Sequence, residues 1–255
     1  MTRYAIISDI HGNCSALIAV LNRIAALEVD HIICLGDVVG YGPEPERCMD
    51  LVTTTCDLCV RGNHDRGIID PETSIAFNEV AQYALDMSRD CLSSLHIQAI
   101  IDMPESIELE PGICCSHETP AAGDYSYIQD AKSAAIAFER SEYQIALVGH
   151  THIPMLFAYD QQADHGSAIS PGDIVAHLPR HNTPLELNPD QRYIANPGSV
   201  GQPRDCDPRA SFAVLDTAQR TFTVHREEYD IAAAQRIFHN VGLPGILADR
   251  LAVGA

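Results

Sequence analysis

Aspartate, histidine and asparagine side chains recur directly after short apolar runs of this chain. Asp9 and His11 follow the run at residues 4–8, and His150 and His152 repeat their spacing after residues 145–148. Carboxylates and imidazoles held side by side suit a divalent transition metal. One such pair is weak support, but the recurrence predicts a metal centre. The candidate ligands are Asp9, His11, Asp37, Asn63, His117, His150 and His152.

The apolar runs before these side chains have the length and composition of buried strands. A helix capped by Asn13 is predicted over residues 15–24, between strands at residues 4–8 and 31–35, so the two strands should be parallel. Residues two apart on a strand point to the same face, so Asp9 and His11 should project together from the strand end. In open α/β sheets, ligands bind at that edge.

The two halves of the chain differ in their expected elements. The first half alternates helices and strands, whereas the second half is β-rich, with a hairpin expected over residues 210–227. This pattern predicts an α/β (α+β) fold in which two mixed β-sheets pack face to face with helices outside, a four-layer αββα sandwich. The polar segment at residues 161–189 is expected to form an inserted hairpin or lid, with a strand at 174–178.

Composition restricts the partners. The 255 residues carry a formal charge of −19, which argues against nucleic acid and anionic membranes. An anionic substrate would then need bound cations to reverse the local field. No apolar run is long enough to span a bilayer, and the first strand begins too early to leave room for a signal peptide. Nine cysteines, mostly in or beside apolar runs, suggest reduced thiols and a cytoplasmic location.

Five sequence blocks stand in a fixed order. They are Asp9-x-His11, Gly36-Asp37, Gly62-Asn63-His64-Asp65, His117 and Gly149-His150-x-His152. In order and relative spacing, these blocks resemble the calcineurin-like metallophosphoesterase superfamily over residues 3–155. The loop at 39–43, the stretch at 196–205 and the C-terminal helix resemble a prokaryotic phosphodiesterase-like branch. The resemblance implies a single metallophosphoesterase domain over residues 1–255.

The resemblance also implies two divalent metal ions, drawn from Mn, Fe, Zn and Ni. It assigns one ion to Asp9, His11 and His152 and the other to Asn63, His117 and His150, with Asp37 bridging the two. The implied reaction is attack of hydroxide held by both metals on a small or nucleotide-like phosphate monoester or diester. His64 would stabilise the transition state or protonate the leaving alkoxide. Substrate contacts are expected from Asn63, His64 and Arg204.

The loop after Asp37 departs from the protein Ser/Thr phosphatases of this superfamily. Those enzymes carry an aspartate that orients the catalytic histidine and then an arginine that grips phosphate, where this chain has Gly40 and Tyr41. A protein phosphatase of that type is therefore not expected, and the group that orients His64 stays open. Arg204 could clamp phosphate, or it could be a solvated arginine in an acidic loop.

Two other functions compete with hydrolysis of a small ester. The same fold serves as a protein-interaction scaffold in the retromer subunit of the superfamily, which has lost the catalytic histidine that this chain keeps as His64. A nuclease is the other alternative, and the negative charge and the lack of a basic or aromatic stripe argue against it. Substrate identity, the physiological metals and oligomeric state stay open.

Overall fold

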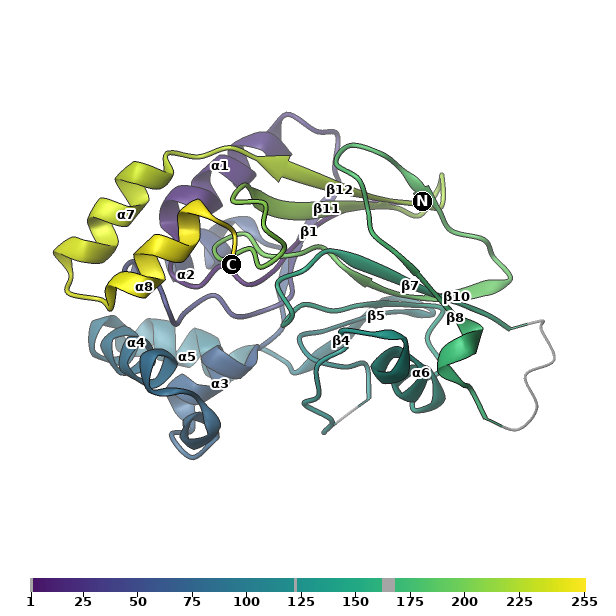
Figure 1. Cartoon of the computed structure of the whole chain (residues 1–255), viewed down its shortest axis with the longest axis horizontal. Helices are drawn as coiled ribbons and strands as arrows, with labels where there is room; N and C mark the ends of the chain where they lie inside the picture. The colour runs from purple at the N-terminus through teal and green to yellow at the C-terminus, as the bar shows by residue number, and fades with distance from the viewer. Residues whose placement is uncertain (1, 122, 162–167) are drawn as a thin grey trace.

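Two six-stranded mixed sheets form the centre of the computed structural model, which describes residues 2–121, 123–161 and 168–255 (Figure 1). The first sheet has the order β3 (Leu58–Cys59), β2 (His31–Cys34), β1 (Arg3–Ile7), β11 (Ala210–Asp216), β12 (Thr221–Glu227) and β9 (Leu185–Glu186). The second has the order β4 (Ser106–Glu110), β5 (Ile113–Ser116), β6 (Ile145–Leu147), β10 (Gln191–Asn196), β7 (Met155–Asp160) and β8 (Ile174–His177).

The sheets pack against each other through apolar side chains. Ile6 and Leu215 of the first sheet lie in one buried cluster with Cys115 and Leu147 of the second. The opposite faces are covered by helices, with α1 (Cys14–Ala25) and α2 (Pro45–Thr55) on the first sheet and α6 (Ala131–Glu139) on the second (Figure 1). The predicted four-layer arrangement is confirmed.

The remaining helices lie at one end of the sheets (Figure 1). They are α3 (Asn63–Ile69), α4 (Glu79–Cys91), α5 (Ser94–Asp102), α7 (Ile231–Asn240) and α8 (Gly245–Asp249), with 3-10 turns at Thr73–Ala76 and Arg250–Ala252. A further 3-10 turn, Pro171–Asp173, lies beside α6. Buried Ala84 of α4 packs with Phe238 of α7 and Leu247 of α8. The C-terminal helices therefore close over the helices that follow β3.

Parallel pairing of β1 with β2 sets the position of the first site residues. Ile7 pairs with Cys34, and the intervening α1 begins after Asn13, whose side chain accepts a hydrogen bond from the Ala16 N–H. The expected strand–helix–strand unit and its cap are confirmed. The structure corrects one step of the reasoning: β1 ends at Ile7, so Asp9 and His11 belong to the following loop and not to a pleated strand.

The segment at residues 161–189 contributes an edge strand to each sheet. β8 pairs with β7 and confirms a strand close to the expected position, while β9 pairs with β12. Residues 162–167 of this segment lie outside the described residues. None of the helices within the described ranges has the length and apolar character that a membrane span requires.

Candidate metal centre

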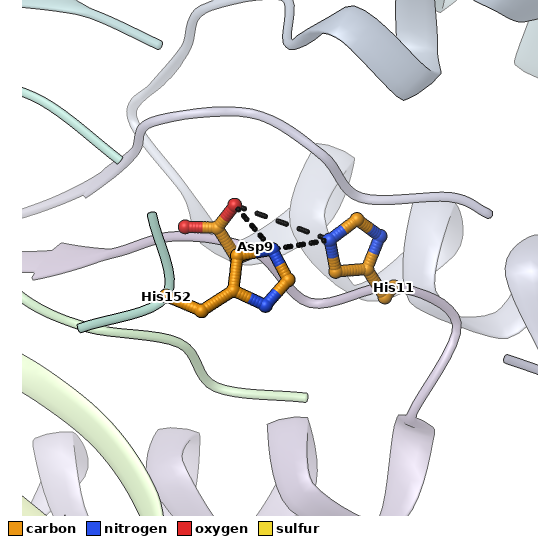
Figure 2. A group of neighbouring side chains, drawn as sticks. All are labelled: Asp9, His11 and His152. Atoms are coloured by element: carbon orange, nitrogen blue, oxygen red, sulfur yellow. Dashed lines mark hydrogen bonds and ion pairs between the residues drawn. The ribbon is translucent and has the colours of Figure 1, made fainter. Parts of the chain in front are cut away.

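Asp9, His11 and His152 converge beyond the end of β1 (Figure 2). The Asp9 Oδ1 atom lies 3.3 Å from Nε2 of His152 and 3.9 Å from Nε2 of His11, and the two Nε2 atoms are 3.1 Å apart. All three side chains are buried. The sequence places His152 more than a hundred residues from the other two, and the packing of the two sheets brings them together.

Main-chain carbonyls fix which ring nitrogen of each histidine carries the hydrogen. His11 Nδ1 donates to the Val39 carbonyl at 3.1 Å, and His152 Nδ1 donates to the Gln202 carbonyl at 2.7 Å. Both Nε2 atoms therefore present lone pairs to each other, an arrangement that only a cation between them stabilises. Burial lowers the pKa of both rings well below the usual value, which disfavours a proton there. A metal ion fits this donor set.

A second group consists of Asp37, His117 and His150. His117 Nδ1 donates to the Leu35 carbonyl at 2.7 Å, so its Nε2, 3.2 Å from Asp37 Oδ2, is the nitrogen that can take either a proton or a metal ion. Burial opposes a charge on His117, but the Asp37 carboxylate outweighs it and raises the pKa of His117 well above the usual value. The His150 main-chain N–H donates to the Asp9 carboxylate at 3.2 Å and ties the two groups together.

Asp37 lies between the two groups. Its Oδ2 atom is 3.6 Å from Nε2 of His11 as well as 3.2 Å from Nε2 of His117. Asn63 begins α3 close by, and its Oδ1 atom is buried with no hydrogen-bond partner among the described residues. An unpaired buried amide oxygen is costly unless a ligand engages it. The structure thus brings all seven sequence-predicted ligands to one edge of the two sheets.

Backbone conformation at the centre is unusual. Five of the candidate ligands have positive φ angles, namely Asp9 (54°), His11 (48°), Asp37 (53°), His150 (69°) and His152 (62°). Residues other than glycine avoid this left-handed region, and such strain concentrates at functional sites. Long-range hydrogen bonds hold the conformation, including His11 N–H to the Asp37 carbonyl at 2.9 Å and Gly201 N–H to the Asp9 carbonyl at 3.0 Å.

Packing orients the ring of His64, and this answers what the sequence left open. The ring lies among those of His11, Tyr41 and Phe77, at centroid distances of 4.8, 4.6 and 4.7 Å. Its Nδ1 atom faces Gly40 and has no hydrogen-bond partner within the described part of the chain. Burial lowers the pKa of His64 to about 4. The main-chain N–H of His64 donates to Asp37 Oδ1 at 2.8 Å, which fixes the start of α3 against the centre.

Asp65 shapes the loop that carries Asp37. Its buried carboxylate accepts the N–H groups of Asp37, Val38 and Val39 at 2.8, 3.0 and 3.3 Å, and that of Gly62 at 3.0 Å. Burial, with the nearby Asp37, raises the pKa of Asp65 to about 6. In the sequence, Asp65 stands out only as the last residue of the Gly62-Asn63-His64-Asp65 block. Its position three residues after Gly62, at the start of a helix, is the signal that could have shown this role.

Arg204 lies beside the first group of ligands. Its main-chain N–H donates to the His152 carbonyl at 3.3 Å, and its guanidinium is 5.8 Å from the ring centroid of Tyr41. The Nη2 atom donates to Gln202, whereas Nε is buried and unpaired as far as the described residues go. Arg204 is therefore not a fully solvated arginine, and its positive charge adds to burial in lowering the pKa of His152.

Comparison with known proteins agrees with this geometry. The family model of the calcineurin-like phosphoesterase superfamily domain matches residues 2–220. The chain belongs to this superfamily. A similar solved structure, a metallophosphoesterase from Sphaerobacter thermophilus, is 37% identical, with a TM-score of 0.85 over 100% of this chain and 99% of that one. The superfamily resemblance seen in the sequence blocks is thereby confirmed.

Other relatives extend the match across the chain. An uncharacterized protein of Methanocaldococcus jannaschii is 31% identical over 98% of this chain and 97% of its own. A hypothetical protein from Pyrococcus horikoshii shares the fold, with 20% identity and a TM-score of 0.75 over 100% of this chain and 99% of that one. Superfamily membership supports a phosphoesterase that uses divalent metal ions, and the clustered His and Asp side chains could bind them.

A cavity of about 450 Å³ opens beside the centre of this superfamily member. Asn63 and His150 line it together with the aromatic residues Phe77, Tyr125 and Tyr127. The sequence reasoning missed these three rings. They come from segments between regular elements, and no spacing in the sequence indicates that they meet beside the ligands.

Proposed function

We propose that this chain is a metal-dependent phosphoesterase that hydrolyses a small or nucleotide-like phosphate monoester or diester with two divalent metal ions. The main support is that two groups of donor side chains meet at Asp37. The Asp37 Oδ2 atom lies 3.6 Å from Nε2 of His11 and 3.2 Å from Nε2 of His117. The ring of His64 packs against that of His11. Superfamily membership supports the reaction class. The donor set suits Mn, Fe, Zn or Ni.

The ligand assignment follows the two groups. Asp9, His11 and His152 would hold one ion, Asn63, His117 and His150 the other, and Asp37 would contribute to both. Divalent ions bound there would supply Lewis acidity toward phosphate and lower the pKa of the attacking water. Carbonyl hydrogen bonds to Nδ1 hold the rings of His11, His117 and His152 with Nε2 turned toward the donor groups.

The protein groups around the phosphate would complete the reaction. His64, held by packing in one orientation, would stabilise the transition state or protonate the leaving alkoxide. Asn63 would contact the phosphate from the start of α3. Arg204 would clamp a phosphate oxygen through its guanidinium, whose Nε has no partner among the described residues.

Hydrolysis of nitrophenyl phosphates tests the proposal. Purified protein should cleave p-nitrophenyl phosphate, bis(p-nitrophenyl) phosphate or both in the presence of Mn²⁺, and elemental analysis should find two metal ions per chain. His64→Ala should lower turnover by about 10²- to 10⁴-fold, whereas His239→Ala, at an exposed position on α7, should not. A folded protein that hydrolyses neither ester with Mn, Fe, Zn or Ni would contradict the proposal and favour a scaffold.

A further inference from the structure

The cavity beside the metal centre has aromatic walls, and we call it the aromatic cavity. It is lined by Phe77, Tyr125 and Tyr127 and shares Asn63 and His150 with the centre. A molecule bound at the centre can therefore reach into the cavity without crossing protein. Its volume of about 450 Å³ falls within the range of about 300–1,000 Å³ that is usual for small-molecule sites.

Two of the rings connect the aromatic cavity to site histidines. The Tyr127 ring stacks on His150, with centroids 3.7 Å apart and planes at 19°, and the Phe77 ring lies 4.7 Å from His64 at 35°. Tyr127 nevertheless stays 48% exposed, and Phe77 is only half-buried. Aromatic surface of this kind normally buries itself in a core. Here it borders the path by which a substrate would approach the ligands.

The charged groups in the cavity wall neutralise each other. Arg66 contacts the buried carboxylate of Glu118 at 3.1 Å and lies 3.6 Å from the Glu105 carboxylate. Its guanidinium also lies 4.2 Å from the ring centroid of Tyr125. With one arginine beside two carboxylates, this described part of the wall has no net positive charge to attract a second phosphate. Arg204, the positive group next to the ligands, lies on the His152 side and is not among the described residues that line the cavity.

We infer that the aromatic cavity binds a planar aromatic group of the substrate, so that the preferred esters carry an aryl or nucleobase ring close to the scissile phosphate. This inference rests on the proposed function for placing the phosphate at the metal centre. The ring stacks against Tyr127 and Phe77 in the offset or tilted arrangements that aromatic pairs prefer. Esters with a small alkyl group leave these rings exposed to water and bind less tightly.

Phosphonates provide a test that does not depend on hydrolysis. Phenylphosphonate and methylphosphonate share the anionic group, differ in the ring, and have no ester bond to cleave. Isothermal calorimetry of the Mn²⁺-loaded protein should show phenylphosphonate binding about tenfold more tightly. Tyr127→Leu and Phe77→Leu should each reduce that preference about three- to fivefold, whereas Tyr127→Phe should retain it. In each of the two leucine variants, methylphosphonate affinity should change less than phenylphosphonate affinity.

A matched control is available on α4. Tyr83 is 49% exposed, similar to Tyr127, and is not among the described residues that line the cavity. Tyr83→Leu should leave the preference intact. Equal affinities for the two phosphonates in the unmodified protein, or variants that weaken both equally, would overturn the inference. If nitrophenyl phosphates are still hydrolysed in that case, the proposed function stands and only the aromatic preference is refuted.

A second binding series distinguishes a nucleobase from an aryl group as the ring that occupies the aromatic cavity. Adenosine 5′-phosphate and methyl riboside 5-phosphate share the phosphate and the sugar and differ only in the base. Tighter binding of adenosine 5′-phosphate, lost in Tyr127→Leu, supports a nucleobase as the occupant of the aromatic cavity. Equal binding of this pair, together with a preserved preference for phenylphosphonate, supports a ring bonded directly to the phosphate group.

Discussion

Replacing Gly40 with alanine would place a methyl group against the ring of His64. A Cβ atom at Gly40 would lie 2.3 Å from His64 Nδ1 and 3.0 Å from Cγ, far inside van der Waals contact. The ring cannot simply rotate away, since the rings of Tyr41 and Phe77 lie 4.6 and 4.7 Å from it. Gly40→Ala should therefore displace His64 while leaving every candidate metal ligand in the chain.

Backbone strain at residue 40 sets the expected loss of stability, and displacement of His64 sets the expected loss of turnover. Gly40 has φ +83°, and an L-residue in this left-handed region costs about 1–2 kcal/mol of stability. Displacement of a catalytic group by about 1 Å lowers turnover on the order of 10²-fold. We expect Gly40→Ala to fold, to bind two metal ions, and to hydrolyse bis(p-nitrophenyl) phosphate about a hundredfold more slowly.

Gly112 provides the matched control, because the same substitution there brings the strain without the clash. It has φ +84°, and a Cβ atom would meet nothing nearer than 3.7 Å. Gly112→Ala should therefore lose similar stability and keep its turnover. The double variant Gly40→Ala/His64→Ala should be no slower than His64→Ala alone. Unchanged turnover in Gly40→Ala, at a stability equal to that of Gly112→Ala, would refute packing by Gly40 as the device that positions His64.

Four further outcomes are expected. Asp65→Asn should lower the free energy of unfolding in urea by about 3 kcal/mol, because a buried carboxylate that accepts four N–H groups is lost; an unchanged midpoint would contradict this. Burial and nearby Arg23 lower the pKa of His225 to about 4, so below pH ~6.5 the unfolded chain binds a proton that the folded chain does not. The free energy of unfolding should fall as the pH drops from ~6.5 toward 4, and in His225→Phe this fall should be smaller by about 2 kcal/mol. The same pH dependence in the variant and the unmodified protein would disprove this. Mn²⁺ at a hundredfold excess over Kd should stabilise the protein by about 2.7 kcal/mol, and chelation should reverse this. Asp9→Asn should not be stabilised by Mn²⁺ and should lose all turnover, while its circular dichroism stays the same. If the variant is unfolded instead, Asp9 has only a structural role at the end of its strand.

The clustering of the candidate ligands could be predicted because it depends on local order. Each ligand follows an apolar run whose burial is specified by its own residues, and parallel strands bring their carboxyl ends to one edge. Ile7 and Cys34 are paired neighbours, so the residues that follow them, Asp9 and Asp37, meet whatever the rest of the chain does. The capped α1 and the hairpin of β11 and β12 are local features of the same kind.

Other features depend on contacts that no spacing reveals. The left-handed backbone at Asp9 and His11 is held by hydrogen bonds to the loops at Asp37 and Gly201. The two side chains do lie together as predicted, but because of this loop conformation and not because of alternation along a strand. The helix α3 begins at Asn63, where the sequence showed only a polar strand end, because the Asp65 side chain accepts the N–H of Gly62 and the Asp37 side chain accepts that of His64. The rings of the aromatic cavity come from separate segments.

The anionic substrate of the proposed function must be reconciled with a protein charge of −19. The centre buries the Asp9 and Asp37 carboxylates, and Asp65 lies directly behind them. Arg66 is occupied by carboxylates, which leaves Arg204 as a positive group beside the ligands. One arginine cannot offset several buried carboxylates, so under the proposed function phosphate should bind only when cations fill the donor groups. Metal affinity and phosphate affinity are then thermodynamically linked, and each ligand strengthens the binding of the other.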